Sequence, residues 1–253
     1  MKNIILFVSV SLILQACSHA GHLSKTAVII AHDYTDSNRI VPDANSVLDL
    51  YNYNSKVLCY AGYFKQTSIS DFINNQEVDF SIPNEDEGEK ENLLDDPLFR
   101  KKEVLAFRDS VFHSVKQTSV IGSCEKPESR IYETICNELH ALVKIDADRK
   151  FLIVSSDLCE NSEVVGSYKK SFLRIITTDR EKAKEALIKK FEDVCELPDD
   201  LKGISIYVLY KPDTKQNDIR FTFFREVYRD LFEPRGAKLF IKSINVIKQY
   251  SNE

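Results

Sequence analysis

Short runs of apolar, β-branched residues alternate along this chain with longer stretches in which apolar residues recur at helical spacing. The runs at 27–31, 150–158 and 203–210 have the length and continuity of buried parallel strands. At 76–82 apolar and polar residues alternate, which predicts a half-buried edge strand. Further strands are predicted over 56–65 and 237–241, and helices over 38–54, 95–117, 131–142, 181–194 and 219–232.

This alternation indicates the fold class. Strands that alternate with helices throughout form an α/β sheet with crossover connections, covered on both faces. We therefore predict a three-layer α/β domain over 26–253, with a mostly parallel, twisted, Rossmann-type sheet and one antiparallel edge strand. The hydrophobic fraction of 43% is sufficient for such a core.

Polar side chains follow the first strand directly. Asp33, Thr35 and Ser37 occupy alternate positions after the apolar run at 27–31. Open α/β sheets bind ligands beyond the carboxyl ends of their strands, and oxygen atoms are the ligands that Mg²⁺ prefers. The pattern thus indicates a cation site, although the same residue types are also common in turns and as helix N-caps.

A second buried strand, at 150–158, also leads to an aspartate, Asp157. In a parallel sheet the ends of two such strands can lie side by side, so Asp33 and Asp157 are expected at one edge. Ser129 precedes a predicted helix and offers a further hydroxyl, or serves simply as its N-cap.

The N-terminal segment has the pattern of a targeting sequence. Lys2 precedes an apolar stretch at 4–14, which is shorter than the roughly 20 residues of a membrane span. The residues that follow, Leu14-Gln15-Ala16-Cys17, resemble a bacterial lipobox. The resemblance implies a signal peptide at 1–16, lipidation of Cys17, a tether at 17–25 and a location in the cell envelope, facing the periplasm. The alternative is an ordinary secretory signal.

The net charge limits the class of partner, and the cysteines limit the disulfides and metal sites that the chain can form. A net charge of −5 and a pI near 5.7 argue against nucleic acid. Apart from Cys17, five cysteines permit up to two disulfides and one free thiol, or are buried small hydrophobes. No pair has CxxC spacing, which argues against a zinc or thioredoxin-like site. These cysteines are Cys59, Cys124, Cys136, Cys159 and Cys195.

The elements at the strand ends resemble a known family. Asp33-x-Thr35-x-Ser37 is similar to the DxSxS or DxTxS element of von Willebrand factor A-type (VWA) domains. Ser129 stands where that family often has a threonine before a helix, and Asp157 resembles the aspartate that ends its fourth strand. The resemblance implies a metal-ion-dependent adhesion site in which these five residues hold Mg²⁺ or Mn²⁺, and an acidic group of a partner protein completes the octahedron.

The sequence departs from the family pattern at three positions. Tyr34 and Asp36 replace the small residues of the first element, and Leu158 follows Asp157 where the family has glycine.

We therefore expect a lipid-anchored binding module that holds a partner protein through a divalent cation, and no enzymatic activity. No G-x-S-x-G, HExxH or P-loop pattern occurs. One alternative is a metal-dependent, phosphatase-like hydrolase with Asp33 as nucleophile, although Thr35 stands where such enzymes have a second aspartate. Another is a structural envelope protein with a degenerate metal site.

Overall fold

The computed structural model describes residues 25–36, 38–52, 61–70, 77–82, 97–118 and 128–247. Cys17, Ser37, Cys59, Cys124 and the whole predicted signal peptide lie outside these residues. Among the helices of the described ranges, none has both the length and the apolar character required to cross a bilayer.

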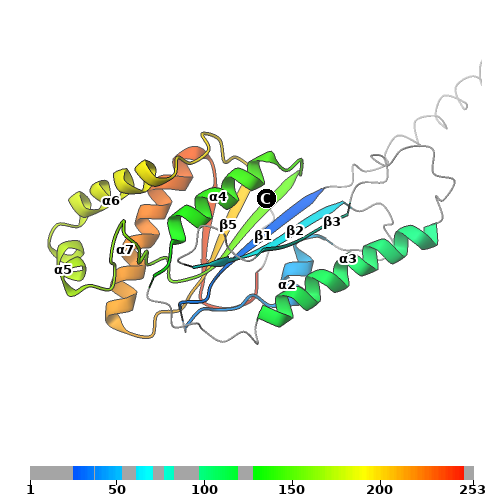
Figure 1. Ribbon diagram of the computed structural model, residues 1–253, viewed down its shortest axis with the longest axis horizontal. Helices are drawn as coiled ribbons and strands as arrows, with labels where there is room; N and C mark the ends of the chain where they lie inside the picture. The colour runs from blue at the N-terminus through cyan, green and yellow to red at the C-terminus, as the bar shows by residue number, and fades with distance from the viewer. Residues whose placement is uncertain are drawn as a thin grey trace, which may run out of the picture.

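Six strands form one sheet at the centre of the protein (Figure 1). They are β1 (Thr26–Asp33), β2 (Gly62–Ile69), β3 (Glu77–Ile82), β4 (Arg149–Ser155), β5 (Ile204–Leu209) and β6 (Lys238–Lys242). Their order is β3-β2-β1-β4-β5-β6, and every pairing is parallel except that of β2 with the edge strand β3. The predicted α/β class, with one antiparallel edge strand, is confirmed.

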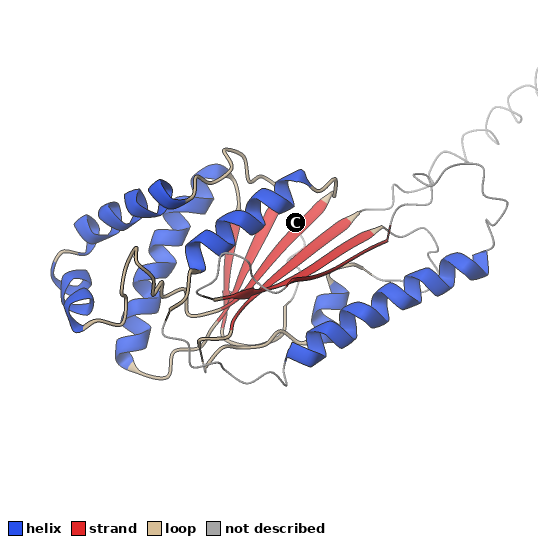
Figure 2. Cartoon of the chain, viewed as in Figure 1, coloured by secondary structure: helices blue, strands red, loops and turns tan. Residues whose placement is uncertain are grey.

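Helices cover both faces of the sheet (Figure 2). α2 (Ala44–Asp49) and α3 (Pro97–Thr118) lie on one face, whereas α4 (Ile131–Lys144), α6 (Arg180–Val194) and α7 (Lys215–Phe232) lie on the other. α5 (Lys170–Thr178) packs beside α6 and α7, and a short 3-10 helix, Glu233–Arg235, follows α7. The result is a three-layer arrangement.

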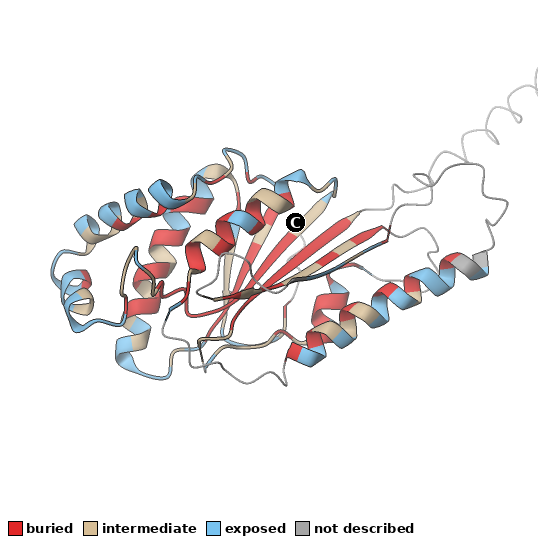
Figure 3. Cartoon of the chain, in the orientation of Figure 1, coloured by how far each residue is buried: buried red, intermediate tan, exposed pale blue. Residues whose placement is uncertain are grey.

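The period of two along β1 creates two separate cores. Ala27, Ile29 and Ala31 face the layer of α4, α6 and α7, whereas Val28 and Ile30 face α2 and α3. All five side chains are fully buried (Figure 3). A strand enclosed on both faces has no solvent-facing side, which is why its sequence is continuously apolar.

Two predicted elements differ from the structure, and one helix was not predicted. The second strand spans Gly62–Ile69 and so continues beyond the predicted end at 65, because its last residues alternate with polar ones after the apolar run; residues 56–60 of the prediction lie outside the described residues. The first helix is confined to 44–49: Asp43 caps it by accepting a bond from the Ser46 N–H at 2.9 Å, and the helix ends before Leu50. α5 was not predicted although Phe172, Leu173 and Ile176 contact the core from one side of it, because the helix is only nine residues long.

Candidate functional site

The strand order reverses at β1, which pairs with β2 on one side and with β4 on the other. In open α/β sheets, ligands bind at such a switch point, beyond the carboxyl ends of the strands. Asp33 is the last residue of β1 and Asp157 follows the end of β4, so both predicted carboxylates lie at this edge.

The carboxylate of Asp33 is held from two sides. It is 1% exposed. Its Oδ1 accepts hydrogen bonds from the backbone N–H of Thr35 at 2.9 Å and from the Thr35 hydroxyl at 2.5 Å. Its Oδ2 accepts a bond from the Ser156 hydroxyl at 3.0 Å. These bonds join the turn after β1 to the end of β4.

Asp157 lies one residue beyond Ser156 and is 4% exposed. Its Oδ1 accepts a hydrogen bond from the backbone N–H of Cys159 at 2.8 Å, and its Oδ2 accepts one from the hydroxyl of Tyr168 at 2.6 Å. Tyr168 belongs to the loop between β4 and α5, so this loop folds back over the strand edge.

The residue after Asp157 has an unusual backbone. Leu158 adopts a left-handed conformation with φ of 63°, which costs a residue with a side chain roughly 1–2 kcal/mol. Its side chain is 1% exposed in the core on the α4 side, and this burial offsets the cost. The glycine of the family pattern would be free of strain at this position.

Four carboxylates share the edge, and burial raises the pKa of each. Burial, followed by the charges of Asp33 and Asp36, raises the pKa of Asp157 to about 7. Burial raises the pKa of Asp33, against the lowering effect of its hydrogen bonds. The pKa of Asp36 is about 6 and that of Glu160 about 7, in both cases mainly because of burial. The Oδ2 atom of Asp36 is buried without a hydrogen-bond partner.

Ser129 lies at the same edge but does not cap α4. It pairs with Asn161 through two backbone hydrogen bonds, of 2.9 and 3.2 Å. The N-cap residue of α4 is Arg130, whose side chain makes no capping bond. Glu160 takes that role from a distance, because its carboxylate accepts a bond from the Tyr132 N–H at 2.9 Å. The N-cap reading of Ser129 is therefore wrong.

His32, next to Asp33 in the sequence, takes no part in the hydrogen bonds of this edge. Its ring is fully buried, and neither ring nitrogen has a hydrogen-bond partner. Burial, together with the charge of Arg39, lowers the pKa of His32 to about 3. The imidazole is neutral at physiological pH.

The structure thus brings Asp33, Thr35 and Asp157 together and places Ser129 on the adjoining loop, whereas Ser37 is outside the described residues. Of the other residues, Asp36 is one of the departures from the family pattern. The roles of Ser156, Glu160 and Tyr168 were not anticipated, because they depend on how the loop after β4 folds back.

The carboxylates of this edge cannot surround a hard cation by themselves, so a site here would also need hydroxyl and water oxygens as ligands. Among the described residues, no three carboxylates at this edge have ligand atoms within 4.8 Å of one another. Within the same residues, the one group of His, Cys, Asp or Glu side chains that meets this distance is Cys136, His140 and Cys195, away from the edge. Each carboxylate oxygen has two lone pairs. Asp157 therefore retains acceptor capacity beside its bonds from Tyr168 and Cys159.

Comparison with protein-family models, curated proteins and solved structures found no match to this chain. The fold and the strand edge define an α/β protein with a Rossmann-like sheet and an acidic, buried cluster at its switch point.

We expect Tyr168→Phe to destabilise the protein more at pH 8 than at pH 5. The hydroxyl bond lowers the pKa of Asp157, so its loss costs most when that carboxylate is charged, about 1.5–3 kcal/mol, and about 1 kcal/mol or less when it is neutral. Thermal melting at the two pH values, with EDTA present, measures the difference.

Tyr51→Phe is the matched control. The Tyr51 hydroxyl donates to the backbone carbonyl of Tyr63 at 2.8 Å, an acceptor that does not titrate. Its cost should be the same at both pH values, and an equally constant cost for Tyr168→Phe would show that Asp157 is not the titrating partner.

Proposed function

We propose that this protein is a VWA-like binding module that holds a partner protein through a divalent cation at the carboxyl edge of its sheet. One observation carries the proposal: two buried carboxylates, Asp33 and Asp157, lie at the ends of adjacent parallel strands, and burial raises the pKa of both. Buried like charges are costly unless a proton or a cation compensates them.

Asp33, Thr35 and Asp157 are the described residues that would hold Mg²⁺ or Mn²⁺ from the strand ends, and Ser129 would do so from the loop before α4. Ser37, which lies outside the described residues, completes the proposed set. When bound, the cation supplies a coordination position for a carboxylate of the partner, because an octahedral ion takes six oxygen ligands and the proposed set offers five. Thr35 and Ser156 orient Asp33, and Tyr168 orients Asp157.

We propose binding without catalysis. A carboxylate nucleophile must be accessible to a phosphorylated substrate, whereas Asp33 is 1% exposed. This burial speaks against the phosphatase-like alternative, in which Asp33 attacks phosphorus.

We further propose that the mature chain is anchored in the cell envelope by a lipid on Cys17. The support is the Leu14-Gln15-Ala16-Cys17 pattern after a short apolar stretch. Intact-mass analysis of the purified mature protein tests this, since an unacylated Cys17 would contradict it.

Capture from envelope extracts tests metal and partner together. We expect wild type to retain a protein in Mg²⁺ and to release it in EDTA, and we expect Asp157→Asn to retain at least about tenfold less. Asp213→Asn is the control, since Asp213 is an exposed carboxylate bonded to Asn38 and Asn217. Retention that is the same in EDTA, or the same for both variants, would contradict the proposal.

A further inference from the structure

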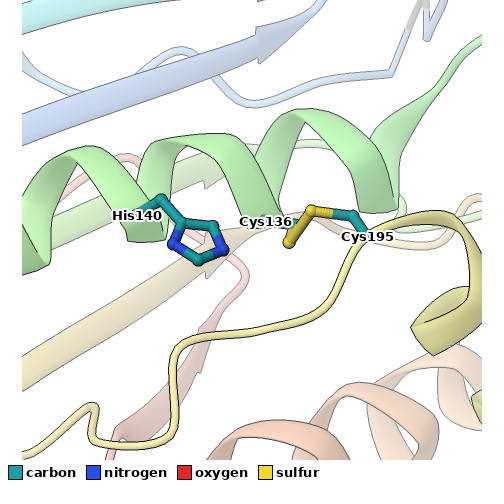
Figure 4. A group of neighbouring side chains, drawn as sticks. All are labelled: Cys136, His140 and Cys195. Atoms are coloured by element: carbon teal, nitrogen blue, oxygen red, sulfur yellow. A yellow bond between two sulfur atoms is a disulfide. The ribbon is translucent and has the colours of Figure 1, made fainter.

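Two cysteines and a histidine converge away from the strand edge, where α4 passes the end of α6 (Figure 4). Cys136 and His140 are four residues apart on α4, so they share one helix face. Cys195 directly follows α6 and forms a disulfide with Cys136. The ligand atoms of the three side chains all lie within 4.8 Å of one another.

A backbone carbonyl completes this cluster. The oxygen of Glu196 lies 2.8 Å from the Nε2 atom of His140, 3.4 Å from the sulfur of Cys136 and 4.0 Å from that of Cys195. The segment is held in place by Tyr132, whose hydroxyl donates to the Cys195 carbonyl at 2.8 Å. The Glu196 carbonyl oxygen therefore lies against all three side chains of the cluster.

We propose that the reduced form of this cluster is a zinc site, with Cys136, His140 and Cys195 as ligands and the Glu196 carbonyl or a water in the fourth position. Thiolate sulfur and imidazole nitrogen are the ligands that Zn²⁺ selects, in tetrahedral sites with Zn–S of about 2.3 Å and Zn–N of about 2.0–2.1 Å. Cys136 is buried, whereas His140 and Cys195 are partly exposed, so the ion has a path from solvent.

The disulfide and the zinc site exclude each other. A reductant such as a phosphine gives two electrons to the S–S bond and leaves as phosphine oxide with an oxygen from water, while the two sulfurs take up two protons. Zinc then displaces those two thiol protons and binds the thiolates. The oxidised pair has no thiolate to offer, so the redox state decides whether this cluster binds metal.

The proposed ligands do not form a local sequence motif. Cys136 and Cys195 are 59 residues apart, and only the packing of α4 against the end of α6 brings them together. A search for closely spaced cysteines in the sequence does not detect such a group.

Zinc titration of the full mature chain tests the proposal. Wild type, reduced by a phosphine and freed of oxygen, is titrated with Zn²⁺ against a chromophoric chelator, and with Co²⁺ to detect thiolate-to-cobalt absorption. We expect reduced wild type to bind one more zinc than reduced Cys195→Ser, and oxidised wild type to show no cobalt absorption at this cluster. The remaining cysteines are common to both reduced proteins, so they cancel in the comparison.

His140→Gln and His113→Gln form a matched pair. Both histidines are on helices and have a ring nitrogen near a backbone carbonyl, at 2.8 Å for His140 and 2.7 Å for His113. We expect His140→Gln to weaken zinc binding by at least about tenfold and His113→Gln to leave it unchanged. Equal zinc binding by reduced wild type and reduced Cys195→Ser, or equal affinities of the two glutamine variants, would overturn the proposal.

Discussion

Asp157→Asn is expected to raise the melting temperature at pH 8 in the absence of divalent cations, although it removes a charged residue from a hydrogen-bonded position. The pKa of this carboxyl is about 7 in the folded protein against 3.8 for the ordinary side chain. At pH 8 the folded protein must therefore hold a buried charge that the unfolded chain holds in water. We expect the neutral isostere to gain about 2–4 kcal/mol, since one pKa unit corresponds to about 1.4 kcal/mol.

The gain should disappear on acidification. A group whose pKa is raised by folding stabilises the protein fully below its unfolded pKa, and this contribution is lost as the pH rises through the folded value. At pH 5 the folded Asp157 already carries a proton, so wild type and Asp157→Asn should melt at nearly the same temperature.

The comparison between variants is required because other groups titrate in the same window. The pKa of His32 is lowered to about 3 in the fold. His32 therefore stays neutral below pH 6.5 while the unfolded chain takes up a proton, which destabilises the fold as the pH falls. Asp213, whose pKa is lowered by its bonds from Asn217 and Asn38, is the control: Asp213→Asn should give no gain at pH 8. A loss of stability in Asp157→Asn at pH 8 would contradict this account of the edge.

Loss of the Cys136–Cys195 disulfide has the second large expected effect. The bond closes a loop with a sequence separation of 59 residues, and chain-entropy arguments assign such a loop a stabilisation of about 4 kcal/mol. For a domain of this size, we expect the melting temperature of Cys136→Ser/Cys195→Ser to fall by roughly 8–16 °C.

Reduced wild type is the internal comparison and should melt close to the double variant when zinc is absent. Cys159→Ala removes a buried thiol that takes part in no disulfide and serves as the control for the loss of a cysteine side chain. If the reduced protein melts within about 2 °C of the oxidised protein, the disulfide does not stabilise the fold.

Much of the fold follows from periodicity because the relevant faces are fully buried. The strands around Ile29 and Ile153 are enclosed on both sides, and a continuously apolar sequence is the direct consequence. The helix around Leu139 buries one stripe against the sheet, which produces the spacing of a helix. The one-sided apolar pattern of α5 extends over only nine residues, and β2 continues through polar positions beyond its apolar run, so the positions of both depend on tertiary contacts.

The candidate site likewise contains residues that the sequence predicts and residues that it does not. Asp33 and Asp157 could be placed at one edge because adjacent parallel strands end together. Glu160 and Tyr168 could not, because the loop after β4 returns to the edge through a bridge between Ser129 and Asn161 that no local pattern indicates. The pairing of Cys136 with Cys195 was one of several possible connectivities and required the packing of α4 and α6.

The central claim is that the strand edge holds a divalent cation, and melting temperature against Mg²⁺ and Mn²⁺ at pH 8 tests it most directly. We expect wild type to gain about 2.7 kcal/mol at a hundred times Kd, or roughly 5–10 °C. Asp33→Asn and Asp157→Asn should show no metal-dependent gain. Ser129→Ala should gain less than wild type, and Thr134→Ala should gain as much, because the Thr134 hydroxyl donates to the Arg130 carbonyl within α4. A wild type that does not respond to millimolar metal, or an Asp157→Asn variant that responds equally, would contradict the claim.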